Sequence, residues 1–197
     1  MNKGLTAKGR ATRQRIVVAT ALLTREKGAA ETTLDDVRAA TATSKSQLFH
    51  YFPDGRSDIL SAVAEYEAEK VLEAQQPFLN DLSTWESWNK WRQAVLAHYT
   101  ELGQRCPLGG LTAELGKSSP QAQAIVSTLF DDWEKALLRG VEAVTSDGPE
   151  AARDRAQSIL AAIQGGVVML QATGRTKYLE AALKAAIDPL RPVSADA

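Results

Sequence analysis

A run of small polar and basic side chains, Ser44-Lys45-Ser46-Gln47, stands directly before an apolar and aromatic stretch. A lysine can bind phosphate, and a glutamine can offer a paired donor and acceptor to the edge of an adenine base. Short serine side chains would let a helix backbone approach a DNA groove closely, and the N–H groups at a helix start favour anions. The run therefore predicts contact with nucleic acid.

Gln47 also has a second interpretation. Ser44 and Gln47 stand three residues apart, as the two members of a capping box do at the start of a helix. In that role the glutamine side chain would bond to the backbone of its own helix. Base contact and capping both remain open for Gln47.

Other residue types that carry catalysis or bind metals are scarce. The sequence has two histidines, His50 and His98, in different parts of the chain, and one cysteine, Cys106. It contains no nucleophile elbow, no phosphate-binding glycine loop and no His/Asp/Glu cluster at metal-ligand spacing. We therefore expect no metal, no cofactor and no enzymatic activity, and we expect Cys106 to be a small buried apolar residue.

Charge is unevenly distributed along the 197 residues. Residues 1–56 hold ten Lys and Arg against five Asp and Glu, residues 57–197 hold thirteen against nineteen, and the net charge is −1. The first acidic residue is Glu26, and the basic residues Lys3, Lys8, Arg10, Arg13 and Arg15 all precede it. A basic segment on an acidic body is expected to meet a polyanion. Because no segment resembles a membrane span or a signal peptide, we expect a cytoplasmic location and no membrane partner.

Apolar residues recur every three or four positions along most of the chain, which predicts helices throughout. Thr33 and Ser44 should each begin a short helix, and Pro77 should disfavour continuation of a longer one over about 57–76. Further helices are expected over about 83–104, 109–116, 119–145, 149–173 and 176–188. The predicted fold is all-α with about nine helices. We divide it into an N-terminal arm and helix-turn-helix DNA-binding domain, 1–56, and a helical ligand-binding and dimerisation domain, 57–197.

The two short helices resemble the DNA-binding head of the tetracycline-repressor (TetR) family of bacterial regulators. The similarity rests on the stretch TLDDVRAATATSKSQLFHYFP, which begins at Thr33, and above all on its ending LFHYFP. The segments FPDGR and CPLGGLTAEL look like those of one branch of the family. The resemblance implies a homodimer whose heads enter successive major grooves of double-stranded operator DNA, while the remaining helices bind a small-molecule effector and form the dimer.

Ten residues are expected at the DNA from charge and from this resemblance. Thr33 would cap its helix on a phosphate, and the Arg56 guanidinium would bind phosphate at the start of the next helix. The ten are Arg10, Arg13, Thr33, Ser44, Lys45, Ser46, Gln47, His50, Tyr51 and Arg56. Phe49 stands where the family usually has a tyrosine that binds phosphate, so this contact should be missing. Leu48 and Phe52 are expected in the core of the head.

The turn between the two short helices departs from the family pattern. The family usually has Gly followed by Val there, whereas this chain has Ala42 followed by Thr43. If the turn requires a positive φ, alanine costs about 1 kcal/mol more than glycine. We therefore expect a turn that is either strained or reshaped.

The body carries Trp85, Trp88 and Trp91 on one predicted helix and Trp133 on another. Their spacing fits a helical core, and it also fits an apolar cavity with a few polar groups. The family resemblance favours a cavity. The candidate ligand-binding residues are Trp88, Arg92, Tyr99, Leu111, Glu114, Phe130 and Trp133.

Two apolar stripes near the C-terminus are candidates for the dimer interface. Two such helices from each subunit would make a four-helix interface, as the family resemblance implies. The candidates are Ile159, Ile163, Gly166, Val167, Leu170, Leu179 and Leu183. In the alternative, the two stripes pack against each other within one chain.

These features predict a ligand-responsive transcriptional regulator, a repressor that a small apolar or amphipathic effector releases from its operator. One alternative is an activator or a DNA-binding regulator that responds to no ligand. Another is an all-α small-molecule-binding protein whose head no longer binds DNA.

Overall fold

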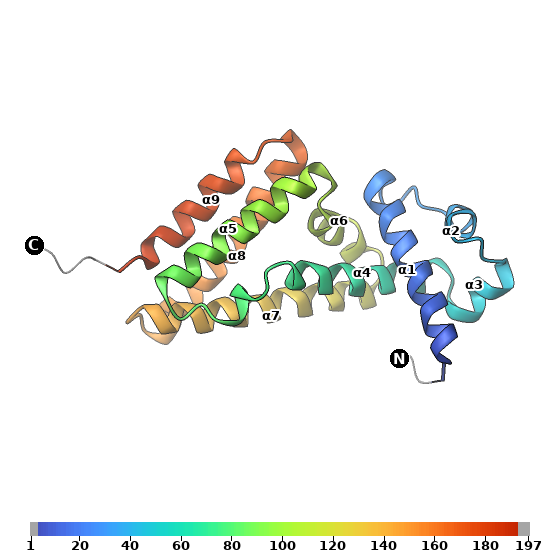
Figure 1. Cartoon of the computed structure of the whole chain (residues 1–197), viewed down its shortest axis with the longest axis horizontal. Coiled ribbons are helices and arrows are strands. Elements are labelled where there is room, and N and C mark those ends of the chain that lie inside the picture. The colour runs from blue at the N-terminus through green and yellow to red at the C-terminus, as the bar shows by residue number, and fades with distance from the viewer. Residues whose placement is uncertain (1–3, 193–197) are drawn as a thin grey trace, which may run out of the picture. The chain divides into compact units, whose positions relative to one another are not determined.

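The computed structural model describes residues 4–192, so Lys3 lies outside the described residues. Within this range the chain forms nine α-helices, four short 3-10 helices and no strand (Figure 1), which confirms the all-α prediction. The helices are α1 (Ala7–Lys27), α2 (Leu34–Thr41), α3 (Lys45–Tyr51), α4 (Arg56–Glu73), α5 (Trp85–Leu102), α6 (Pro107–Ala113), α7 (Pro120–Val144), α8 (Pro149–Thr173) and α9 (Lys177–Ile187). None of the described helices is long and apolar enough to cross a membrane.

The helices form two compact units. The head unit contains the chain up to Glu69 together with Gly110–Ser127, and the body unit contains Lys70–Gly109 together with the chain from Thr128 onward. The expected boundary after residue 56 falls inside the head unit. The reason is that Glu67 of α4 bonds to Arg25 of α1, and Glu114, directly after α6, bonds to Ala29 in the loop between α1 and α2. The assignment of residues 1–56 to DNA binding stays a prediction.

Contacts between residues far apart in the sequence hold the head unit together. On α4, Glu67 is 1% exposed and accepts hydrogen bonds from Nε and Nη2 of Arg25 on α1, at 2.9 and 2.6 Å. The Glu114 carboxylate accepts the backbone N–H of Ala29 at 2.5 Å. Leu48 and Phe52, at 0% and 1% exposure, lie in the core as predicted.

In the body unit, α9 packs against α8 and against α5. Gly166 of α8 permits this packing, because a Cβ there would lie 2.7 Å from the Cα of Leu179. All seven residues expected at the dimer interface are buried within the single chain: Ile159, Ile163, Gly166, Val167, Leu170, Leu179 and Leu183. The two stripes therefore pack together in the core, as in the alternative interpretation, and they do not form an outer surface.

Candidate nucleic-acid interface and effector site

Helix α2 begins with a complete capping box. The Thr33 hydroxyl accepts the Asp36 N–H at 3.1 Å, and the Asp36 carboxylate accepts the Thr33 N–H at 2.8 Å. Lys27 of α1 lies 2.8 Å from the same carboxylate. Lys27 and then Thr33 hold the pKa of Asp36 well below its ordinary value, because both stabilise the charged form. Capping by Thr33 is confirmed, and its contact with phosphate stays a prediction.

The turn after α2 keeps the left-handed conformation in spite of its sequence. Ala42 has φ 50° and ψ 37°, and it is the only described residue other than glycine with a positive φ. Its N–H donates to the Arg38 carbonyl. The Thr41 hydroxyl donates to the Thr43 hydroxyl at 2.8 Å, and Arg15 donates to the Thr41 carbonyl. The turn is therefore strained at Ala42 and not reshaped.

Helix α3 begins with a second capping box, which involves Gln47. The Ser44 hydroxyl accepts the Gln47 N–H at 3.2 Å, and Gln47 Oε1 accepts the Ser44 N–H at 3.1 Å. The capping interpretation of Gln47 is confirmed, and base contact stays a prediction. The start of α3 is a solvent-facing polar surface, because its four residues and His50 are exposed while Leu48 is buried.

The basic side chains of the head unit differ in the contacts that they form with the rest of the chain. Arg56 donates to the carbonyls of Thr32 and Ala30, at 3.3 and 3.4 Å, and also to that of Ala29, so it secures the loop before α2. The Arg13 guanidinium lies 5.0 Å from the centroid of the Phe52 ring.

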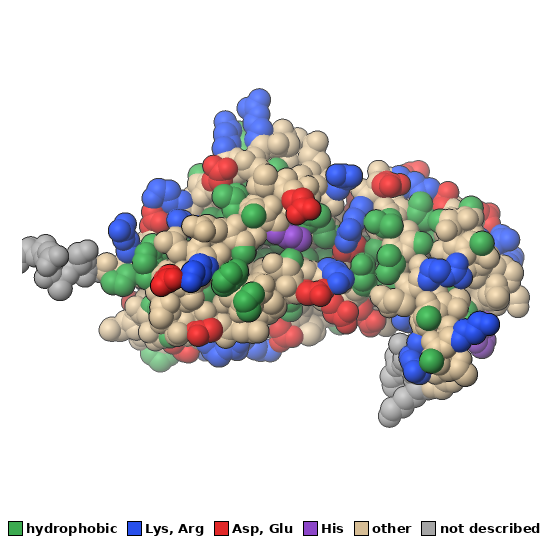
Figure 2. Space-filling view, viewed as in Figure 1, with side chains coloured by type: hydrophobic (Ala, Val, Ile, Leu, Met, Phe, Trp, Pro, Cys, Tyr) green, Lys and Arg blue, Asp and Glu red, His purple; other side chains and the backbone are tan. Residues whose placement is uncertain are grey.

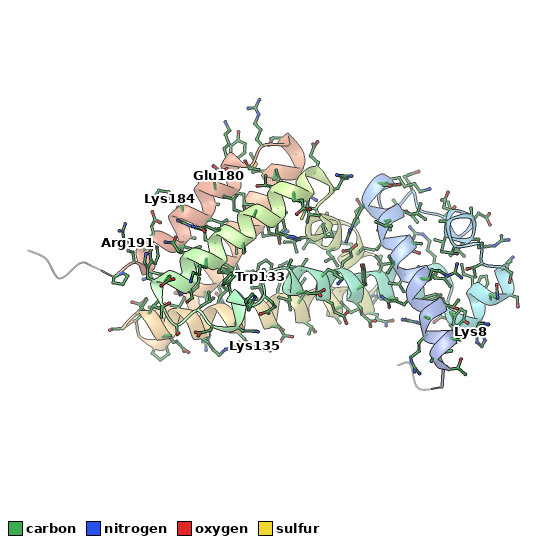
Figure 3. All side chains as sticks on the ribbon, in the orientation of Figure 1. Lys8, Trp133, Lys135, Glu180, Lys184 and Arg191 are labelled. Atoms are coloured by element: carbon green, nitrogen blue, oxygen red, sulfur yellow. The ribbon has the colours of Figure 1, made fainter. Side chains whose placement is uncertain are left out.

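Other basic side chains are less engaged. Arg10 donates to the Leu5 carbonyl at 2.8 Å. Lys8 and Lys45 form no ion pair with any described residue. Lys and Arg side chains are visible at several separate places on the head unit (Figure 2). Lys8 lies near the start of α1 (Figure 3).

Sequence reasoning missed Arg38, which lies beside the turn. Its guanidinium donates to Asp35 at 2.8 Å, and its Nε is buried without an acceptor. An open groove of about 480 Å³ runs past it, lined by Asp35, Arg38, Ala39, Ala42, Thr43 and Ser44. The i,i+3 spacing of Asp35 and Arg38 was the available signal, but it predicts only an ion pair.

Tryptophans form the centre of the body unit. Trp88, Trp91 and Trp133 are fully buried, and the first two meet edge to face with ring centroids 5.5 Å apart. Trp91 Nε1 donates to Gln75 Oε1 at 3.0 Å, whereas the indole N–H groups of Trp88 and Trp133 are buried without an acceptor. Figure 3 shows Trp133 on α7. These residues are core in this structure, and they carry two unused hydrogen-bond donors.

Three further candidates for ligand binding also belong to the body unit. Tyr99 is buried, and burial raises its pKa well above the ordinary value. Arg92 donates to Asn89 at 2.7 Å and to Asp188 at 3.3 Å, so its guanidinium is already partly satisfied. Phe130 is half-buried. Cys106 is buried, as expected.

The last two candidates, Leu111 and Glu114, lie in the head unit. Leu111 is fully buried, and Glu114 binds the Ala29 backbone. The predicted set is therefore divided between the two units. This division could not be predicted from the sequence, because Glu114 bonds to a residue 85 positions earlier in the chain.

Comparison with known proteins supports the same class of molecule. Residues 86–185 match the family described as the C-terminal domain of LmrA/YxaF-like transcriptional regulators. An HTH-type transcriptional regulator of Mycobacterium tuberculosis is 27% identical over 165 residues, which cover 80% of this chain and 82% of the relative. An HTH-type transcriptional regulator of Lactococcus lactis is 26% identical over 178 residues, which cover 87% of this chain and 89% of the relative.

Solved structures share the fold. A TetR transcriptional regulator from Chloroflexus aurantiacus has a TM-score of 0.76 at 23% identity, over 93% of this chain and 96% of that one. The regulatory protein TetR from Rhodobacter sphaeroides has a TM-score of 0.75 at 16% identity, over 90% and 97%. Because the matched C-terminal segment spans just over half of the sequence, the chain belongs to the TetR family of transcriptional regulators, in its LmrA/YxaF-like group.

Proposed function

We propose that this protein is a transcriptional repressor that binds operator DNA as a homodimer and leaves it when a small molecule binds the body unit. The observation that carries the proposal is the exposed polar surface at the start of α3, from Ser44 to Gln47. Two capping boxes fix the helices that carry this surface, so it is ordered before DNA arrives. In this proposal α3 lies in the major groove.

Gln47 is proposed to read a base through one half of its amide. Its Oε1 accepts the Ser44 N–H, which leaves the Nε2 group as the outward donor. Bidentate pairing with adenine would need Oε1 to accept a second hydrogen bond while it faces the Ser44 N–H. We therefore favour a single hydrogen bond from Nε2 to a base-edge acceptor such as guanine N7 or thymine O4.

Gln47→Glu separates reading from capping, because glutamate also serves in a capping box but lacks the Nε2 donor. The variant should fold like the wild type and lose about 1–3 kcal/mol of base preference at one position per half-site. Gln93→Glu changes the same charge at an exposed position of α5 and is the control. If Gln47→Glu keeps the wild-type order of preference among competing DNA sites, Gln47 is only a cap.

Phosphate contacts are assigned first to Lys8 and Lys45, which form no ion pair with any described residue. Arg10, Arg38 and Arg56 can contribute through the donors that their hydrogen bonds within the chain leave free. Arg13 can contribute from its position over the Phe52 ring. Each neutralised phosphate should add about 0.9 to the slope of log affinity against log salt. A dimer with six to ten such contacts should lose roughly 10³–10⁵ in affinity between 50 and 200 mM salt, and a flat response would contradict this assignment.

The outward face of α8 is proposed to meet the second copy. It presents Val168 and Met169, which are 50% and 39% exposed. Gly165, one turn earlier, is also exposed, and a Cβ there would meet nothing within 4 Å. Glycine inside a helix costs about 1 kcal/mol relative to alanine. Because the chain's own packing does not require Gly165, its presence favours close approach of a helix from the partner copy.

Val168→Glu should convert the dimer to a monomer and weaken DNA binding, since both heads are needed for two half-sites. Helicity should be unchanged, because the side chain is half exposed in the single chain. Analytical ultracentrifugation and circular dichroism measure both effects, with Gln93→Glu again as the matched charge control. A Val168→Glu protein with the wild-type mass in solution would remove this face from the interface.

The effector is proposed to bind the body unit beside Trp88 and Trp133. A buried donor without an acceptor costs roughly 1–3 kcal/mol, so a ligand that supplies an acceptor can recover part of this free energy. We propose an amphipathic molecule with an apolar body and at least one oxygen or nitrogen acceptor.

Such a compound should quench tryptophan fluorescence and release DNA over the same concentration range. Trp133→Phe removes the N–H, so it should weaken ligand binding and leave DNA binding without ligand intact. Trp85→Phe, at a half-buried position, is the control. DNA binding that persists with every quenching compound would favour the ligand-independent regulator. A fall in transcription after loss of the protein would favour the activator.

A further inference from the structure

A cavity of about 330 Å³ lies within the head unit. Its walls come from α1, the end of α3, the first turns of α4 and the start of α7. Three polar residues of its α4 wall, Asp58, Ser61 and Glu65, have no part in the DNA contacts proposed above. A cavity of this volume lies at the lower end of the range for small-molecule sites.

The α4 wall offers acceptor groups along one face of the helix. Asp58, Ser61 and Glu65 stand at positions i, i+3 and i+7, and all three line the cavity. Ser61 is 3% exposed, yet its hydroxyl oxygen has no hydrogen-bond partner. A buried hydroxyl without a partner is uncommon in native proteins and requires an explanation.

The two carboxylates of this wall form no ion pair within the part of the chain that the structure describes. Asp58 accepts the backbone N–H of Asp54 at 2.9 Å, and no described residue forms an ion pair with Asp58 or Glu65. Arg13 also lines the cavity, but its guanidinium lies over the Phe52 ring, 5.0 Å from the centroid. A cationic ligand therefore finds two unpaired anionic groups and one unsatisfied hydroxyl.

The spacing of these groups defines the length of the ligand. With a rise of 1.5 Å per residue, Asp58 and Ser61 lie about 4.5 Å apart along the axis, and Ser61 and Glu65 about 6 Å apart. Nitrogens separated by three and by four methylene groups lie about 5 and 6 Å apart in an extended chain. We propose that the cavity binds a linear aliphatic polyamine, with terminal ammonium groups at Asp58 and Glu65 and an inner nitrogen that donates to Ser61.

Binding of such a cation should affect the DNA surface. His50 and Tyr51 line the same cavity at the end of α3, and both belong to the expected DNA contacts. A polyamine would neutralise two carboxylates next to these residues and so reduce their repulsion of phosphate. This consequence, an increase in DNA affinity, rests on the proposed function, whereas amine binding itself does not.

Calorimetric titration of the full chain with spermidine, without DNA, tests the site directly. We expect one molecule bound per chain and about two- to fivefold weaker binding in Asp58→Asn and in Glu65→Gln, which corresponds to the loss of one exposed ion pair in each variant. Glu69→Gln is the matched control, because Glu69 is exposed on α4 but does not line the cavity. Absence of binding, equal binding by all the variants, or an equal loss in Glu69→Gln would overturn the proposal.

Ser61→Ala adds a readout that a purely structural role would not give. Spermidine affinity should fall severalfold, while the melting temperature without ligand should hold or rise, because the hydroxyl has no partner to lose. Unchanged affinity for spermidine in Ser61→Ala would contradict the assignment of Ser61.

Shorter and simpler amines test the class of ligand. Putrescine should bind more weakly than spermidine, and n-butylamine should not bind measurably. Equal binding of n-butylamine would overturn the polyamine assignment. Because spermidine also binds DNA directly, its effect on the complex is compared between the wild type and Glu65→Gln at equal concentration. If the protein does not bind DNA, the titration without DNA still tests polyamine binding. The proposed polyamine site and the proposed DNA-binding function can therefore be refuted independently.

Discussion

Replacement of Ala42 by glycine should stabilise the protein, although it shortens an exposed side chain in the turn that positions α3. Ala42 has φ 50°, a region in which an L-residue with a Cβ is strained. Its side chain is exposed, so little packing is lost when the methyl group is removed. The balance therefore depends on backbone conformation alone.

The size of the effect follows from two opposing contributions. The left-handed conformation costs an ordinary L-residue roughly 1–2 kcal/mol, which glycine largely avoids. Glycine also has more conformational freedom in the unfolded chain, which opposes folding by about 0.4–1 kcal/mol. The free energy of unfolding should therefore rise by about 0.5–1 kcal/mol in Ala42→Gly.

Urea denaturation followed by circular dichroism measures this change as a higher midpoint with an unchanged slope. Ala39→Gly is the matched control, because Ala39 is exposed one turn earlier within α2. That substitution should destabilise by about 1 kcal/mol, since glycine is a poor helix former. The same Ala→Gly substitution should thus raise the free energy of unfolding at residue 42 and lower it at residue 39. If Ala42→Gly destabilises as Ala39→Gly does, the turn does not hold the left-handed conformation in solution.

Three further predictions each test a single feature of the fold. Asp36→Asn should lower the free energy of unfolding at pH 7. The folded state lowers the pKa of Asp36, so the charged carboxylate stabilises the protein above its ordinary pKa of 3.8, and this contribution is lost as the pH falls toward the folded-state pKa. In urea denaturation the difference in stability between variant and wild type should shrink below pH 4, and a constant difference would contradict the pairing with Lys27. Gly109→Ala should destabilise by about 1 kcal/mol, because the Gln171 amide would have to move away from the new Cβ and lose its hydrogen bond to the Cys106 carbonyl. Gly110→Ala, with nothing within 4 Å, should be neutral or stabilising in thermal denaturation. Gly166→Ala should likewise lower the melting temperature, because its Cβ would meet Leu179, and a variant as stable as wild type would show that α9 can withdraw from α8.

Local features could be predicted from the sequence because their causes are local. Thr33 and Ser44 cap their helices through residues three positions ahead, so a short window contains both partners. Helix ends were less exact. The helix expected to reach residue 76 ends at Glu73, and the one expected from residue 109 begins at Pro107, a residue that suits the first turn.

Long-range partners could not be predicted in the same way. The apolar stripe through Ile163 and Val167 was evident, but periodicity shows that a face is buried and not what buries it. Leu179 and the rest of α9 cover this face within one chain. Glu114, a candidate for ligand binding, accepts the Ala29 N–H, and this contact could not be predicted because it depends on a fold that brings distant segments together.

Several positions in this chain carry a cost that the single chain does not compensate. Ala42 holds a strained φ, Gly165 weakens a helix with open space beside it, and Ser61 and Trp133 bury polar groups without partners. Each cost is about 1–3 kcal/mol, a noticeable part of the 5–15 kcal/mol that stabilises an ordinary domain. Three of the four lie on surfaces proposed here for a second copy, a polyamine and an effector. A ligand that satisfies such a group binds only the folded state and must raise its stability. Thermal stabilisation by spermidine should therefore shrink in Ser61→Ala and stay unchanged in Trp133→Phe, whereas stabilisation by the effector should show the reverse pattern.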